Sequence, residues 1–529
     1  MKNLMCVIAV WAAVSCSTLF AGTNYVWTGS AAPMAPYSSW GTAAHSIQDA
    51  VDAAVEGTVV LVTNGVYTLS SQIYVVTNNI VVKSVNGAGK TIIDGNFFTR
   101  CIYVRGDSTI DGFLVRNGNP PVGSGGGIFV LNIGEVLNCM FTNNVTPVDG
   151  GAVCAVNTLI TNCYFKGNNA KDGGGVCLRL DSLVQNCIFE DNVATNGGAV
   201  YCDRAGKLDD CTISLNRAKY GGGVYCYNGG EIYGGLISSN SAMSGGGVFC
   251  SPGSSVSGCT ISGNSVTAFG GGIFIWVDGS IVDNTISLNK ARSGGGVFCS
   301  SGGSVSGCAI RGNRAETTGG GVNIFQAGSI SDCTISGNGA DVGGGAYCNS
   351  AGSLTNCLIY NMNSATFGGG VYLFTGGTLI NCTLAGNNAT AYGGGICTSN
   401  GGSVINTIIY DNQALSGNDN WLNYDSGAGY NYSCTTPTNG LPGGNKCISD
   451  DPLFITSGTD YRLQMGSPCI DEGYFMTWMT TATDLDGNPR IHDGTVDLGC
   501  YEFIPEPGLL FVIFNFLFLI AALSKRYFD

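Results

Sequence analysis

The feature that most constrains this chain is a repeat of about 24 residues that occupies its middle. A glycine-rich word, Gly-Gly-(Gly/Ala)-(Val/Ile), recurs twelve times with spacings of 23 to 25 residues. Its last, aliphatic position is held by Ile128, Val153, Val176, Val200, Val224, Val248, Ile273, Val297, Val322, Ala346, Val371 and Ile396. A unit this short cannot bury a core alone, so we expect the copies to stack as a solenoid.

A second word follows in each copy, with the pattern Cys-x-Ile-x-x-Asn. Its third position is always a large apolar residue, and its sixth is Asn in every copy except the one with Met362. A further apolar column lies three residues before the Cys, as at Val256 and Ile281. Each copy therefore contains three short alternating segments separated by Gly, Ser, Asn and Asp, which is typical of strands and turns.

Three short strands per copy, without a helix-length segment, predict an all-β fold: a parallel β-helix with one copy per coil. Equivalent residues of successive coils then lie about 4.8 Å apart. We expect Ile261, Ile286 and Ile310 to stack in the core, Cys to stack on Cys as wall filler, and Asn to stack on Asn at a turn. The glycines are expected where the backbone needs a positive φ or leaves no room for a Cβ atom.

The repeat divides the chain into five segments. Residues 1–21 are typical of a signal peptide that is cleaved after Ala21, with a lipoprotein signal at Cys16 as the alternative. We expect a cap and irregular first coils over 22–122, twelve regular coils over 123–414, a C-terminal capping region over 415–503 and a tail over 504–529.

An amphipathic segment near the N-terminus predicts a short helix over residues 45–56. Ser46 is expected to be its N-cap. Its apolar face would comprise Ile47, Ala50, Val51, Ala54 and Val55. This helix would cover the open N-terminal end of the coil stack.

The tail carries the motif Pro505-Glu506-Pro507, an apolar run and then Lys525-Arg526. It resembles the PEP-CTERM sorting tails of Gram-negative bacteria. The resemblance implies that an exosortase recognises Pro505, Glu506 and Pro507 and removes the hydrophobic segment, which anchors the chain transiently in the membrane. A plain C-terminal anchor is the alternative, although the run is shorter than the roughly twenty residues of a full span.

Three stretches carry a resemblance to a family: "SIQDAVDAAVEGTVVLVTNGVY", "SPCIDEG" and "DLDGNPRIHDGTVDLGCYEF". With them the chain resembles β-helix proteins of the choice-of-anchor Q type. The coils also resemble the repeats of polymorphic outer-membrane proteins, through the Phe-x-x-Asn words at 141–144 and 165–168. The first resemblance implies a right-handed β-helix that is exported to the cell surface, outer envelope or matrix and has no assigned reaction.

A column of aromatic residues follows the aliphatic position of the first word. Its members include Phe129, Tyr201, Tyr225, Phe249, Phe274, Phe298, Tyr347 and Tyr372. If the flanking Val and Cys point inward, alternation turns the rings outward as a stripe that could bind glycan or protein. The alternatives are a reversed phase, with the rings in the core, or rings that only stack on one another.

Polysaccharide lyases and related enzymes share this architecture, and their chemistry needs clustered carboxylates or a base beside calcium. In the register of the repeat, Asp149 and Asp172 form a stacked acidic pair, and Lys166 stacks on Glu190. These are the candidate catalytic groups, and solvated turn charges are the alternative interpretation. The uniform coils favour the alternative, because an active site normally interrupts a repeat with long loops.

The sequence gives weaker evidence for a metal site or for disulfides. Asp484, Asp486 and Asn488 alternate oxygen ligands as calcium loops do, with an Asx-rich turn as the alternative, and no other cofactor is expected. The chain has 24 Cys but only 2 His and no Cys-x-x-Cys, which disfavours zinc. Disulfides within coils or between Cys434–Cys447 and Cys469–Cys500 compete with a mostly reduced ladder of buried thiols, which we favour.

The net charge of −14 disfavours a nucleic-acid partner, because the chain repels phosphate. The sequence therefore predicts a non-catalytic exported protein for adhesion or glycan binding, whose partners are polysaccharides or surface proteins. A carbohydrate-active enzyme (a polysaccharide lyase or glycoside hydrolase) is the competing class, and a self-assembling structural protein is a third.

Overall fold

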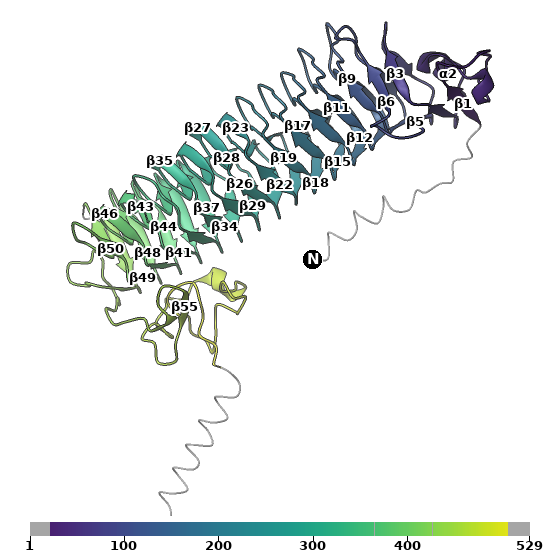
Figure 1. Cartoon of the computed structure of the whole chain (residues 1–529). Coiled ribbons are helices and arrows are strands. Elements are labelled where there is room, and N and C mark those ends of the chain that lie inside the picture. Colours follow the sequence, from purple (N-terminus) through teal and green to yellow (C-terminus); the bar gives the residue numbers. More distant parts are fainter. Residues whose placement is uncertain (1–21, 364, 426, 506–529) are drawn as a thin grey trace, which may run out of the picture. The chain divides into compact units, whose positions relative to one another are not determined.

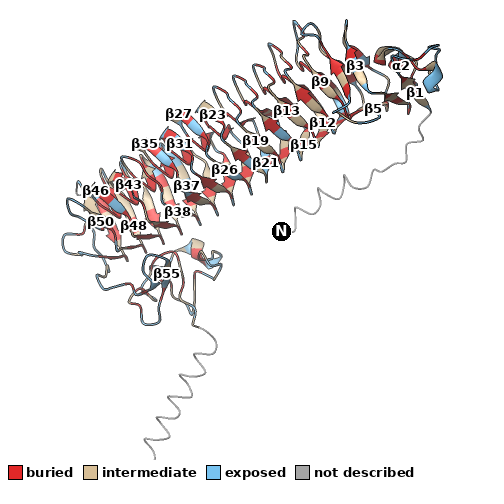
Figure 2. Cartoon of the chain, viewed as in Figure 1, coloured by how far each residue is buried: buried red, intermediate tan, exposed pale blue. Residues whose placement is uncertain are grey.

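The computed structural model describes residues 22–363, 365–425 and 427–505. They belong to two units, Met1–Ala242 with Gly247–Phe249, and Met243–Gly246 with Cys250–Asp529. In each unit short parallel strands stack coil on coil, and buried residues recur in every coil (Figures 1 and 2). The predicted all-β solenoid is confirmed. The predicted signal peptide, Cys16 and the tail from Glu506 onward lie outside the described residues.

The first unit begins with the predicted helix, which is shorter than expected. Helix α2 spans Ile47–Asp52, and the Ser46 hydroxyl accepts the backbone N–H of Asp49 at 3.1 Å. The helix contacts β1 (Thr23–Val26), β2 (Val59–Val62) and β4 (Ile73–Val75), the first strands of the stack. Val55 was expected on the apolar face but is 61% exposed, because the helix has ended before it.

Parallel strands of the first unit bring one column of aromatic side chains into its core. The sheet formed by the second word contains β3 (Gly65–Thr68), β6 (Thr91–Asp94), β9 (Leu114–Arg116), β11 (Met140–Thr142), β13 (Tyr164–Lys166), β16 (Ile188–Glu190), β19 (Thr212–Ser214) and β22 (Leu236–Ser238). Phe141, Phe165 and Phe189 are fully buried, with ring centroids 4.9 and 4.5 Å apart along the stack. Their near-parallel rings fill the interior of three successive coils.

The first word of each copy forms a second set of strands. In the first unit these are β7 (Ile102–Arg105), β10 (Ile128–Leu137), β12 (Val153–Thr161), β14 (Val176–Arg179), β17 (Val200–Asp203) and β20 (Val224–Tyr227). The apolar column before the Cys forms the third set, which includes β5 (Val81–Ser84), β8 (Thr109–Asp111), β15 (Leu183–Gln185), β18 (Lys207–Asp209) and β21 (Glu231–Tyr233). The three predicted segments are therefore strands, but β10 and β12 each join two of them into one long strand. Later coils add a fourth strand, as at β27 (Ser265–Phe269), β31 (Lys290–Ser293) and β35 (Arg314–Thr318).

The second unit repeats this arrangement. Its second-word strands are β26 (Thr260–Ser262), β30 (Thr285–Ser287), β34 (Ala309–Arg311), β38 (Thr334–Ser336), β41 (Leu358–Tyr360), β45 (Thr383–Ala385), β49 (Ile408–Tyr410) and β53 (Cys434–Thr435). Its first-word strands include β28 (Ile273–Val277), β32 (Val297–Ser301), β36 (Val322–Ile324), β39 (Ala346–Cys348), β43 (Val371–Leu373) and β47 (Ile396–Thr398). Ile261 pairs with Ile286 and Ile286 with Ile310, all three fully buried, so the predicted register is confirmed.

The asparagine column forms a buried hydrogen-bonded ladder at the turn. The side-chain amide of Asn168 donates to Oδ1 of Asn192 at 2.9 Å and to the carbonyl of Phe141 at 3.1 Å. The same Asn192 oxygen accepts the backbone N–H of Asn168 at 3.0 Å. Each amide thus satisfies turn groups of its neighbours, which is why Asn is required there rather than another turn residue.

The cysteine column makes polar contacts as well as filling the wall. The Sγ of Cys163 accepts the backbone N–H of Cys139 at 3.4 Å, and its thiol donates to the carbonyl of Val136 at 3.5 Å. In the same way, the side-chain oxygen of Asn284 accepts the backbone N–H of Cys259, and the Thr407 hydroxyl accepts the backbone N–H of Cys382. The expectation of a purely hydrophobic wall filler is therefore incomplete, because these side chains accept hydrogen bonds, whereas Gly235 occupies the same column without an accepting side chain. Cys139, Cys163 and Cys187 of this column are free thiols.

Both expected reasons for the glycines occur within a single turn. Gly294 has a φ of +66°, the left-handed region that favours glycine. A Cβ atom at Gly295 would lie 2.4 Å from the carbonyl oxygen of Gly320, and one at Gly296 2.6 Å from that of Gly321. The triple-glycine word therefore allows close packing of successive coils.

The region after residue 414 differs from the expected cap. Strands β51 (Trp421–Asn423), β52 (Ala428–Asn431) and β53 pair in parallel with β47, β48 (Gly402–Ile405) and β49, so the stack continues by another coil. Residues 452–503 then form β54 (Phe454–Thr456), β55 (Asp460–Leu463) and the short 3-10 helix η2 (Thr477–Thr480). We call residues 452–503 the flanking segment, because they pack against the side of the coils.

The flanking segment shares a hydrophobic cluster with the outer face of the last coils. Leu358, Ala385 and Ile408 of β41, β45 and β49 contact a core that includes Tyr461 and Leu498. The preceding strands of the second unit, β26, β30, β34 and β38, carry Thr, Ala, Ser or Arg at the equivalent outer positions. The outer face is therefore apolar where the segment covers it.

Three left-handed asparagines at one turn hold the flanking segment through their side chains. Asn356 donates to the carbonyl of Thr483 at 3.0 Å, and Asn381 to that of Asp497 at 3.4 Å. Asn406 both donates to the carbonyl of Tyr474 at 2.8 Å and accepts its N–H at 2.7 Å. These three asparagine side chains at the turn of the coils thus bind the flanking segment.

The cysteines of this region are arranged differently from the expected pairs. Cys434, Cys469 and Cys500 lie together in the cluster under the flanking segment. Burial and contact with the Cys469 thiol raise the pKa of the Cys434 thiol. Cys447, the expected partner of Cys434, lies outside that cluster, and its thiol faces the carbonyl of Asn445 at 3.8 Å.

Candidate functional site

The aromatic column lies on the outer side of the first-word strands. Val200 and Cys202 of β17 are fully buried, whereas Tyr201 between them is only half-buried. Successive side chains of a strand point to opposite faces, so the ring points away from the coil interior. Of the two possible orientations of the first-word strands, the structure therefore shows the one in which Val and Cys face the coil interior.

In the first unit the rings also stack on one another. The centroids of Tyr201 and Tyr225 lie 5.4 Å apart and those of Tyr225 and Phe249 4.7 Å apart, with interplanar angles of 17° and 6°. Stacking covers the ring faces, so a ligand would contact the ring edges. It would also contact Tyr227, whose ring packs against Tyr201 and Tyr225. Burial and the nearby Asp172 carboxylate raise the pKa of Tyr201, so its hydroxyl stays protonated.

In the second unit the column is interrupted. Phe274 stacks on Phe298 at 5.5 Å, and Tyr347 on Tyr372 at 5.7 Å. Asn323 occupies the intervening coil, paired with Phe298 on one side and Tyr347 on the other. The expected stripe is therefore divided at Asn323.

Two exposed rings stand beside this interruption, over a hollow of about 300 Å³. Phe325, two residues after Asn323, is 46% exposed, and Phe269 is 40% exposed. The lining residues other than Phe and Tyr are Ser293, Ser300, Thr318, Asn323 and Asn349. None of the described lining residues is charged, so the hollow is an uncharged aromatic site with hydroxyl and amide groups.

The candidate catalytic pair is adjacent, as expected, but its carboxylates are occupied. Asp149 and Asp172 lie in bridged positions of neighbouring coils. Asp149 forms an ion pair with Arg179 and accepts the Ser124 hydroxyl at 3.3 Å. Asp172 accepts the Asn196 amide at 2.6 Å. Burial, with a smaller contribution from the Asp149 charge, raises the pKa of Asp172.

The Lys166–Glu190 pair is a surface ion pair. The Lys166 Nζ lies 3.1 Å from Glu190 Oε1, and the Tyr164 hydroxyl donates to the same carboxylate. Hydrogen bonds from Tyr164 and Lys166 lower the pKa of Glu190. This carboxylate is therefore stabilised as an anion and is poorly suited to donate a proton.

Comparison with known proteins identifies the fold family. The sequence matches the family described as "Right handed beta helix region" over residues 100–255 and 246–414. The chain belongs to the right-handed β-helix family. The predicted handedness is thereby confirmed. No curated protein matches the sequence.

Several solved structures are similar to this chain at low identity. An alginate lyase, AlyF-OU02 with G6, is 15% identical over 63% of this chain and 80% of its own, with a TM-score of 0.36. Pectate lyase Pel9A is 14% identical over 92% and 98%, with a TM-score of 0.20. The mannuronan C-5 epimerase AlgE6 A-module of Azotobacter vinelandii is 13% identical over 73% and 94%, with a TM-score of 0.26. Likeness this distant concerns the fold alone.

The candidate calcium loop of this β-helix protein is an Asx turn. Oδ1 of Asp484 accepts the backbone N–H groups of Asp486 at 2.9 Å and of Asn488 at 2.7 Å. Its Oδ2 accepts the Asn488 amide at 3.1 Å and the N–H of Glu502 at 2.8 Å. Internal donors thus satisfy both carboxylate oxygens of Asp484. Within the described ranges, no group of three His, Cys, Asp or Glu is placed to hold a metal.

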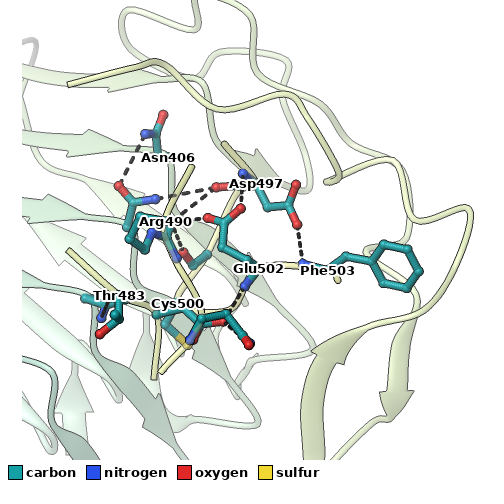
Figure 3. A network of polar contacts seen from close by, with 12 residues as sticks. Asn406, Thr483, Arg490, Asp497, Cys500, Glu502 and Phe503 are labelled. Atoms are coloured by element: carbon teal, nitrogen blue, oxygen red, sulfur yellow. Dashed lines mark hydrogen bonds and ion pairs between the residues drawn. The ribbon is translucent and has the colours of Figure 1, made fainter. Parts of the chain in front are cut away.

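A buried ion pair in the flanking segment escaped the sequence analysis (Figure 3). Arg490 and Glu502 are fully buried, with Nη2 of the arginine 3.1 Å from the carboxylate. The same Nη2 donates to the carbonyl of Gly499 at 3.0 Å, while Nε and Nη1 have no partner. Burial raises the pKa of Glu502 to about 8. The many charged residues of "DLDGNPRIHDGTVDLGCYEF" could have indicated an ion pair in this stretch. The sequence alone does not say which of these residues contact one another.

Pro505 of the sorting motif is the last described residue, two positions beyond the flanking segment, whereas Glu506 and Pro507 lie outside the described residues. Among the residues that the structure describes, there is no helix with the length and apolarity needed to cross a membrane.

Proposed function

We propose that this right-handed β-helix is a non-catalytic, exported protein that binds polysaccharide at the cell surface or in the extracellular matrix. The supporting observation is the outer aromatic stripe of the second unit, with exposed Phe269 and Phe325 above an uncharged hollow. Aromatic rings offer large rigid apolar surface, which suits the C–H faces of sugars, and exposed clusters of this kind typically mark binding sites.

Export and sorting belong to the same proposal and rest on the sequence pattern. Residues 1–21 would direct secretion, and an exosortase-type enzyme would recognise the tail at Pro505. The tail would hold the chain in the membrane until it is processed. Surface proteins are the alternative partners, since an aromatic stripe also suits a protein interface.

A carbohydrate-active enzyme is the second candidate, favoured by one observation. Asp172 combines a raised pKa with a neighbouring carboxylate, as in acid–base pairs. The ion pair of Asp149 with Arg179 argues against it, because the guanidinium occupies the carboxylate that would have to act on a substrate.

One set of measurements tests the proposal. Isothermal titration of the full chain with neutral and acidic polysaccharides should reveal binding, and F325A together with F269A should weaken it at least tenfold. Assays for new reducing ends and for unsaturated products should remain negative. Product formation that D149N or D172N abolishes would establish the enzyme instead, and a chain that binds no polysaccharide would overturn the binding function.

A further inference from the structure

We propose that the interruption of the aromatic column at Asn323 is a binding site for a single neutral pyranose ring. This inference rests on the proposed function and specifies where the ligand sits and which class of sugar it contains. It concerns only the second unit, between Phe298 and Tyr347.

The size of the gap follows from the register. Phe298, Asn323 and Tyr347 occupy one column in three successive coils, so the outer two are separated by two coil spacings, about 9.6 Å. In the first unit the equivalent middle position is filled by Tyr225, which stacks on Tyr201 and Phe249. Asn323 is shorter than a ring, and the hollow of about 300 Å³ that it helps to line opens beside it.

The amide of Asn323 lacks one hydrogen-bond partner. Its Nδ2 donates to the Thr318 hydroxyl at 2.7 Å, whereas its Oδ1 has no partner. The side chain is only 2% exposed, so water does not compensate freely. If the amide is turned over, the other polar atom is left without a partner instead. The unpartnered atom is shielded in the unliganded structure, so a local side-chain movement must accompany ligand binding; a sugar hydroxyl can donate or accept and would then satisfy either amide orientation.

The lining favours an uncharged ligand. Its polar groups are hydroxyls and amides, such as Ser293, Ser300 and Asn349, and it offers no cation to a carboxylate. A uronate seated here would lose hydration without a compensating charge. The chain's net charge of −14 adds long-range repulsion. A neutral hexose has an apolar C–H face for Phe325 and hydroxyls for Asn323, and therefore matches both parts of the site.

Two variants of the full chain test the site. N323F supplies the missing ring, as Tyr225 does in the first unit, so the fold should be kept and the melting temperature should not fall. Binding of cellohexaose, laminarihexaose or mannohexaose, whichever binds the unmodified chain most tightly, should weaken at least tenfold. F374A is the matched control, because Phe374 has the same rim position beside the unbroken Tyr347–Tyr372 stack. It should change affinity less than twofold.

The outcomes separate the site from the function. If N323F retains affinity while F374A loses it, the ligand lies elsewhere on the stripe, so this inference fails and the binding function stands. If hexamers of guluronate or galacturonate bind more tightly than the neutral sugars, the ligand class is wrong. If no oligosaccharide binds at millimolar concentration, both proposals fail. Saturation-transfer NMR, read on the sugar C–H protons, should show contact that N323F removes.

Discussion

The backbone N–H of Asn338 donates to the Sδ of Met362 over 3.2 Å, where the neighbouring coil has an asparagine oxygen. The sulfur is a weaker acceptor, and the side-chain amide of Asn338 loses the forward bond that Asn313 makes to Asn338 itself. The asparagine ladder of the second unit is therefore weakened at Met362.

This weak point can be repaired. We expect M362N to join the ladder between Asn338 and Asn387 and to stabilise the chain by about 1 kcal/mol. Urea denaturation followed by circular dichroism measures the change. M362L, which keeps the volume but accepts no hydrogen bond, should not stabilise, and an equal gain from both variants would contradict the hydrogen-bond explanation.

Removing an asparagine from the ladder should lower the free energy of unfolding by more than M362N raises it. N168A removes the oxygen that accepts both N–H groups of Asn144, so buried donors lose their partner. We expect a loss of roughly 2–4 kcal/mol in the free energy of unfolding. The adjacent Asn169 is exposed, and N169A should change the value by less than about 0.5 kcal/mol. Similar effects of the two substitutions would show that the ladder does not stabilise the turn.

The flanking segment should detach when its asparagine contacts are removed. N406A deletes both hydrogen bonds to Tyr474, and we expect faster hydrogen exchange and proteolysis within residues 452–503. Asn228 has the same left-handed backbone but is exposed at a turn of the first unit, so N228A controls for the conformational cost. Unchanged exchange in N406A would mean that the hydrophobic cluster alone holds the segment.

The buried Glu502 should make the flanking segment sensitive to pH. Because burial raises its pKa to about 8, the folded state holds a proton that the unfolded chain releases above its ordinary pKa. Stability should therefore decrease as the pH rises from about 5 to 8, and it should be fully present below that range. Thermal unfolding at several pH values measures the slope, and E502Q should flatten it. A slope that persists in E502Q would assign the titration to another group.

The cysteines should differ sharply in reactivity. Burial raises the pKa of Cys299 and Cys348 to about 12, whereas Cys447 is the partly exposed thiol among the described cysteines. We expect an aromatic disulfide reagent to label Cys447 first in the native chain and the other thiols only after unfolding. Anaerobically purified protein is the control, and a deficit of thiols in the unfolded aerobic sample would reveal disulfides.

The periodic part of the molecule could be predicted because its contacts connect equivalent residues one coil apart. A column such as Ile261, Ile286 and Ile310 is visible in the sequence, and so is the Asn column. The dual role of the thiols was missed because Cys163 resembles a small hydrophobe in sequence, and only the geometry reveals that its sulfur accepts an N–H group.

By itself, the sequence determined the coil length, the register and the glycine turns, since a short repeat stacks on its nearest neighbours. It left open which face of the first-word strands points inward, and the structure decided that. The tertiary structure decided where the non-periodic parts lie. It placed the flanking segment on β41, β45 and β49, buried Arg490 against Glu502, and opened a hollow at Asn323. These features depend on contacts between residues with no fixed spacing along the chain, so no period in the sequence encodes them.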